Sequence, residues 1–121
     1  MKRTALVRRT PLSRVSSRRA EELRRYRGRC AQFLELHPYC QVWLAEHGID
    51  EAAAVRRCGW VRLCSGARVR APRASSVHHT NKRRHGRLLD ETRWMAVSAA
   101  GHAAIEVNKP WARARGYLSN F

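Results

Sequence analysis

The chain has 121 residues and a formal net charge of +16 at pH 7, because 25 lysine and arginine residues are set against only 9 acidic ones. This length fits one small domain, and the excess of positive charge favours a polyanionic partner, of which nucleic acid is the commonest. No apolar stretch approaches the roughly 20 residues of a membrane span and no secretory signal is visible. We therefore expect a cytoplasmic protein with no membrane partner and with reduced cysteines.

The N-terminal segment, residues 1–19, contains seven lysine and arginine residues, no acidic residue and no apolar periodicity. This composition is typical of a flexible, solvated arm. A simple solubility tail and a mitochondrial presequence are alternatives, but an arm that follows phosphate groups fits the basic remainder of the chain better. We interpret residues 20–121 as the folded domain.

An amphipathic helix is predicted from about Ser17 to Leu36, where apolar side chains recur with a period of 3.6 residues. Pro38 ends this helix. A second short helix is expected over 41–47, and a loop or short hairpin over 49–73. The residues of the apolar face are Leu23, Tyr26, Cys30, Phe33 and Leu34.

The last third of the chain predicts a strand, a basic loop, a second strand and a helix, so we expect an α+β fold. Pro110 is well placed in the first turn of a final helix that Gly116 terminates. The predicted ranges are a strand over 74–79, a loop over 80–86, a strand over 93–97 and a helix over 101–107.

Four residues of this segment are candidate ligands or catalysts. His102 and Glu106 stand four positions apart, so both side chains lie on one face of a helix, where they suit a divalent metal or a simple surface contact. His78 and His79 are neighbours in a strand and point to opposite sides of it. One of them can then bind a metal while the other addresses a different group.

Several short motifs in one order resemble the HNH endonucleases, which have a ββα-metal (His-Me) finger, and in particular their small, basic, phage-encoded type. The resemblance covers most of the chain except about 45–73 and places the finger core at about 74–107. The motifs are RRTPLSRVSSRRAEELRRYR at 8–27, FLELHPYC at 33–40, VHH at 77–79, Gly-Arg at 86–87, LLDETRWMAV at 88–97, GHAAIE at 101–106 and NKPWARARGYL at 108–118.

This resemblance implies a metal-dependent endonuclease that hydrolyses phosphodiester bonds in DNA. His79 matches the general base, and His78, His102 and Glu106 match the ligands of a divalent ion, for which Mg²⁺, Mn²⁺, Ni²⁺ and Zn²⁺ are all eligible. It also implies a bacterial host cell, association with the nucleoid and a partner in a phage assembly. The basic residues expected to hold nucleic acid are Lys82, Arg83, Arg84, Arg87 and Arg93.

Two departures from the family pattern favour an alternative, a nucleic-acid-binding protein of this type without catalytic activity. Arg93 aligns with the family's middle asparagine, which steadies the loop between the strands. The two cysteine pairs that bind a structural zinc in many relatives are incomplete here, since no C-x-x-C motif is present. Cys40 with Cys58 or Cys64 forms at most a rewired zinc site, and we favour tryptophan packing in its place.

Overall fold

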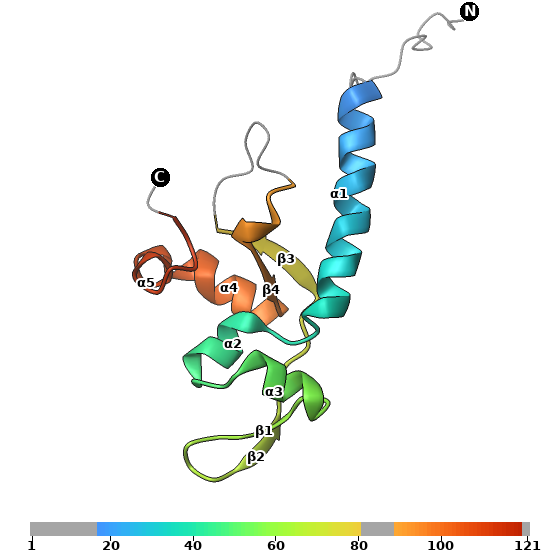
Figure 1. The fold of residues 1–121 in the computed structure, drawn as a ribbon. Helices are drawn as coiled ribbons and strands as arrows, with labels where there is room; N and C mark the ends of the chain where they lie inside the picture. Colours follow the sequence, from blue (N-terminus) through green and yellow to red (C-terminus); the bar gives the residue numbers. More distant parts are fainter. Residues whose placement is uncertain (1–16, 81–88, 120–121) are drawn as a thin grey trace, which may run out of the picture.

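The computed structural model describes residues 17–80 and 89–119 (Figure 1). It has the expected α+β composition, with helices and two separate antiparallel sheets of two strands each. The elements are α1 (Ser17–Leu36), α2 (Gln41–Glu46), α3 (Glu51–Arg56), β1 (Trp60–Arg62), β2 (Arg68–Arg70), β3 (Ser76–His79), the short 3-10 helix η2 (Glu91–Arg93), β4 (Trp94–Val97), α4 (Ala99–Val107) and α5 (Lys109–Ala114).

Helix α1 has the predicted bounds, Ser17–Leu36. On its predicted apolar face Phe33 is buried, and Tyr26, Cys30 and Leu34 are partly buried. Phe33 is buried against Trp94 and Ala96 of β4, and we call these three residues the α1 cluster. Residues 17–19 fall within both the predicted arm and the predicted helix, and the structure places them in α1. Residues 1–16 lie outside the described part of the chain.

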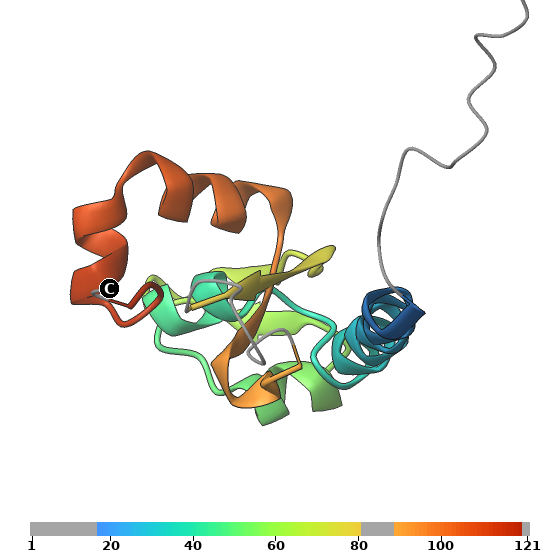
Figure 2. The ribbon, with the colours of Figure 1, turned by 90° about the horizontal axis from the view of Figure 1, so that it is seen from above.

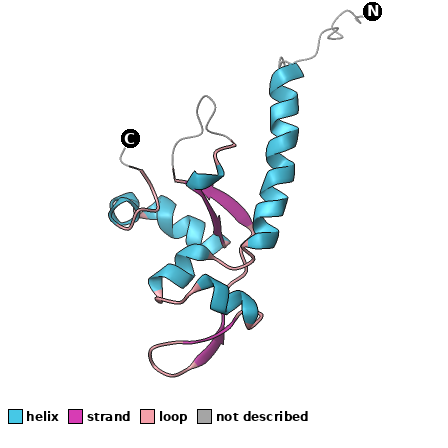
Figure 3. Ribbon diagram, viewed as in Figure 1, coloured by secondary structure: helices cyan, strands magenta, loops and turns pink. Residues whose placement is uncertain are grey.

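The segment 49–73, expected to be a loop or a short hairpin, contains both a helix and a hairpin. Helix α3 begins after Asp50, whose side chain accepts a hydrogen bond from the Ala53 amide and so caps the helix. The hairpin β1–β2 follows, and Figure 3 shows its strands apart from the pair β3–β4. Its inner face packs on the hairpin cluster, which comprises Tyr39, Leu44, Ala54, Val61 and Ala71.

The sheet β3–β4 has a helix against each face. Figure 2 shows α1 on one side of the strands and the helices α4 and α5 on the other. The side chains of Trp94 and Ala96 belong to the α1 cluster. Val97 points the other way, as alternation along a strand requires, and joins the α4 cluster, which comprises Cys40, Val42, Val97, Ile105, Ala112 and Tyr117.

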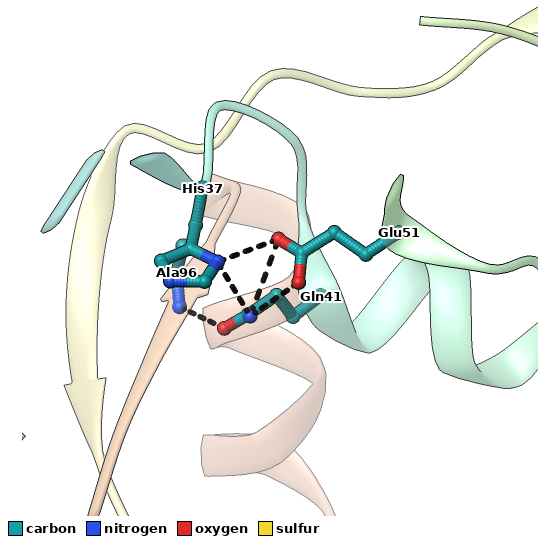
Figure 4. A network of polar contacts seen from close by, with 4 residues as sticks. All are labelled: His37, Gln41, Glu51 and Ala96. Carbon is teal, nitrogen blue, oxygen red and sulfur yellow. Dashed lines mark hydrogen bonds and ion pairs between the residues drawn. The ribbon is translucent and has the colours of Figure 1, made fainter. Parts of the chain in front are cut away.

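A polar network ties the end of α1 to α2, α3 and β4 (Figure 4). The Gln41 side chain accepts a hydrogen bond from the Ala96 amide at 2.7 Å and donates to Glu51. His37 is paired with the same carboxylate at 2.8 Å. The network satisfies a β4 amide that pairing with β3 leaves unpaired, and it fixes α2 against the sheet.

None of the helices within 17–80 and 89–119 is both long enough and apolar enough to cross a membrane.

Candidate functional site

His78 of β3 is held in one orientation by a hydrogen bond to the backbone of Tyr117. Register pairs it with Met95, so its side chain lies on the α4 side of the sheet, and only 5 % of the residue is exposed. Its Nε2 atom donates a hydrogen bond to the Tyr117 carbonyl oxygen at 2.8 Å. A carbonyl can only accept, so in the neutral ring the proton stays on Nε2 and the lone pair on Nδ1.

His102 of α4 approaches His78 on this side of the sheet. The two ring centroids are 5.4 Å apart and the rings are tilted by 58°. Helix α4 begins after Ser98, whose side chain caps it by accepting a hydrogen bond from the Gly101 amide. Gly101 of this helix packs directly against Cys40 at the start of α2; a Cβ built there would lie 2.8 Å from the Cys40 sulfur atom.

Burial lowers the pKa of His78, and the nearby His102 lowers it further, whereas the Tyr117 carbonyl and the Glu106 carboxylate act in the opposite direction. His78 is therefore neutral at physiological pH, which is the form that binds a metal. Glu106 is exposed, one helical turn beyond His102.

These residues fit a divalent ion in part. Two imidazoles converge, one has a fixed tautomer, and a hydrogen bond from the far ring nitrogen to a backbone carbonyl is the usual support of a metal-binding histidine. Glu106 is close enough to influence the pKa of His78. Nevertheless, within the ranges described, no three His, Cys, Asp or Glu side chains form a group that could hold a metal as they stand.

His79 lies on the opposite side of the sheet, as strand alternation predicts. Its Nε2 atom is hydrogen-bonded to the Tyr26 hydroxyl of α1 at 2.7 Å, and the two rings are stacked with centroids 5.6 Å apart. Trp94, its partner across the strands, meets it edge to face, with the two ring centroids 5.9 Å apart. Two aromatic rings and one hydrogen bond thus orient this imidazole on the α1 side of the sheet.

Arg93, which the resemblance aligns with an asparagine, is exposed at the end of η2. Its backbone carbonyl accepts hydrogen bonds from the amide and the hydroxyl of Thr80, at 2.8 and 3.2 Å. Thr80, directly after β3, is therefore linked to the end of η2 through the backbone of Arg93. Four other predicted nucleic-acid contacts, Lys82, Arg83, Arg84 and Arg87, lie outside the described residues.

The three cysteines that were candidate zinc ligands lie in different environments. Cys40 is fully buried in the α4 cluster, whereas Cys58 and Cys64 are exposed near the two ends of β1. All three are free thiols. Cys40 packs against apolar side chains and against Gly101, which is the environment of a core residue.

Two residues that contact the candidate site were not identified from the sequence. Tyr26 was assigned to the apolar face of α1, and nothing in its spacing distinguishes a core tyrosine from one whose hydroxyl reaches His79. Tyr117 acts through its backbone carbonyl, which every residue possesses, so no sequence signal exists for it.

Comparison of the chain with protein-family models, with curated proteins and with solved structures found no match.

Proposed function

We propose that this chain is a metal-dependent endonuclease of the HNH type that hydrolyses phosphodiester bonds in DNA. The observation that carries the proposal is the approach of His78 on β3 to His102 on α4, with the tautomer of His78 fixed by the Tyr117 carbonyl. The order β3, β4, α4 supports a ββα-metal finger, since a hairpin followed by a helix supplies the ligands from both elements.

In this proposal His78, His102 and Glu106 hold a divalent ion. When bound, the ion supplies a positive charge that stabilises the negative charge developing on the phosphate in the transition state. Imidazole and carboxylate together accept Mg²⁺, Mn²⁺, Ni²⁺ or Zn²⁺, so availability decides which ion is used.

His79 is the proposed general base. A histidine with a pKa near neutrality can take a proton from the attacking water and return it to solvent. Stacking on Tyr26 and the hydrogen bond to its hydroxyl fix the ring before substrate binds, which removes an ordering cost from the reaction. Lys82, Arg83, Arg84, Arg87 and Arg93 are proposed to hold the flanking phosphates.

The test is nicking of a supercoiled plasmid in the presence of each of the four ions and of EDTA. We expect metal-dependent nicking by the wild-type protein, and a rate lower by about 10²- to 10⁴-fold in His79→Ala, the usual contribution of a general base. His47→Ala is the matched control, because His47 is exposed at the end of α2. Circular dichroism checks that each variant is folded.

A second candidate function is nucleic-acid binding without cleavage. It is favoured by the lack of a three-ligand group among the described residues and by the orientation of His79 away from His78. It predicts salt-dependent binding to DNA that His79→Ala leaves unchanged, with no nicking by the wild-type protein under any of the four ions. That last result would overturn the endonuclease proposal.

A further inference from the structure

The hairpin β1–β2 has one face that the rest of the described structure leaves open. Burial alternates along both strands: Val61 is buried and Val69 half-buried, whereas the residues on either side of each are exposed. The open face consists of Trp60, Arg62, Arg68 and Arg70. Three of its four side chains are therefore arginines. The hairpin itself lies at the end of the described fold beyond α3 (Figures 1 and 3).

The hairpin is a fixed platform. Val61 belongs to the hairpin cluster and Val69 packs against it. Gly59, with φ of +90°, passes so close to Tyr39 that a Cβ there would lie 2.7 Å from the ring. Its carbonyl accepts a hydrogen bond from the Ala71 amide at 2.7 Å, which closes the base of the hairpin. The open face is thus held in a defined position relative to the core.

The open face carries like charges at opposed positions, an arrangement that destabilises the hairpin. Arg62 is directly opposite Arg68 in the register, and like charges at opposed positions of an antiparallel pair repel. In the ranges that the structure covers, the arginines paired with carboxylates are Arg19, Arg29 and Arg115, none of them in the hairpin. The sequence offers no nearby acid either, since no aspartate or glutamate occurs between Glu51 and Asp90.

The fourth side chain of the face, Trp60, is 44 % exposed and opposite Arg70, whose guanidinium lies 5.7 Å from the ring centroid. Stacking on the indole keeps the guanidinium extended over the surface while its N–H groups stay available to an acceptor. An apolar partner would have to desolvate three guanidinium groups, whereas a row of phosphates pairs with them.

We propose that the open face of β1–β2 binds the phosphate backbone of duplex DNA, independently of base sequence and apart from the histidines of β3. The inference rests on the proposed function only in taking DNA as the partner; it requires no cleavage. A two-stranded ribbon with guanidinium groups on one face gives phosphate contacts that position a duplex without reading its sequence. The hairpin would thereby hold DNA while the candidate site acts elsewhere on it.

The experiment measures binding of a short fluorescent duplex as a function of salt, in EDTA so that no metal-dependent cleavage occurs. Each phosphate contact contributes about −0.9 to the slope of log K against log[salt]. For the double variant Arg62→Gln/Arg68→Gln we therefore expect a slope shallower by about 1.8. The control is Lys109→Gln/Arg113→Gln, which removes the same charge from exposed positions of α5 and leaves the slope near the wild-type value.

An unchanged slope in the hairpin variant, or equal changes in both variants, would overturn the inference. So would loss of binding to anionic phospholipid vesicles in the hairpin variant with DNA binding intact, since that result identifies a membrane surface as the partner. Plasmid nicking separates the two proposals. If the wild-type protein never nicks DNA but its salt slope depends on Arg62 and Arg68, the DNA-binding surface is supported and only the endonuclease proposal is overturned.

Discussion

The two sheets of this chain are alike in size but differ in how many of their faces are covered. In β3–β4, helix α1 covers one face and α4 the other, and Trp94 is only 5 % exposed. In β1–β2 only the inner face is packed, and Trp60 is 44 % exposed. A strand between two layers gives each side chain a specified neighbour, whereas a strand with an open face leaves alternate side chains in solvent.

This difference separates two ways in which a small basic chain can act. On β3–β4, the proposed catalysis would depend on geometry, since His78 and His79 each have a defined partner at hydrogen-bond distance. On β1–β2, the proposed DNA binding would depend on charge, which tolerates small displacements but is weakened by salt. Substitutions in the two sheets should therefore have different costs and different readouts.

The largest expected contrast is between the two tryptophans. Trp94→Ala empties a site between Phe33, Tyr26 and His79 and should lower the free energy of unfolding by about 3–5 kcal/mol. Trp60→Ala loses an exposed ring and its contact with Arg70, which should cost about 1 kcal/mol or less. Urea unfolding of both variants measures the difference; equal costs would show that the two sheets are covered alike.

Gly101→Ala tests how closely α4 packs against Cys40, at the start of α2. The new Cβ would meet the Cys40 sulfur at 2.8 Å, so we expect a loss of about 1–3 kcal/mol in unfolding free energy from overpacking. The clash is with one atom, and Cys40→Ala removes it. The double variant should therefore be more stable than the sum of the two single changes predicts. Strict additivity in this cycle would mean that α4 shifts freely.

Tyr26→Phe removes the hydroxyl from His79 and keeps the stacked ring. If Tyr26 positions the base, the nicking rate should fall by about tenfold or less, the equivalent of one hydrogen bond, with little change in the affinity for DNA. Histidine ring NMR signals of the wild-type protein and the variant should differ for His79 and agree for His47. A wild-type rate and identical spectra would show that the contact has no role in orienting the ring.

The smallest expected effect concerns the opposed arginines. Arg62→Gln relieves the repulsion with Arg68 and should raise the unfolding free energy at low salt by about 0.2–1 kcal/mol, a gain that 1 M salt abolishes. Arg70→Gln is the matched control, because it removes the same charge but also the contact with Trp60. It should be neutral or slightly destabilising. Destabilisation by Arg62→Gln would contradict a repulsive arrangement on the open face.

Long-range contacts mark the limit of what the sequence predicts. Helix α1 was predicted with its bounds because twenty residues display their period clearly, and alternation placed His78 and His79 on opposite sides of β3. Helix α3 was missed because six residues are too few to show a period, although Asp50 before an alanine-rich run is a capping signal.

No sequence pattern indicated the two residues that orient the histidines of the candidate site. The Tyr117 carbonyl reaches His78 from 39 positions along the chain, and any residue at that place would offer the same atom. The hydroxyl of Tyr26 reaches His79 from 53 positions away. Only packing of α1 and of the segment after α5 against the sheet decides these contacts, and that packing depends on the whole chain.

Calorimetric titration of the reduced protein with Ni²⁺ tests most directly whether His78 and His102 form a metal site. We expect the wild-type protein and the His47→Ala control to bind an ion with the same affinity. His102→Ala should bind it at least tenfold more weakly, because it removes one of two converging imidazoles. Equal affinities in His102→Ala and the wild-type protein, or no binding by the wild-type protein, would contradict the account.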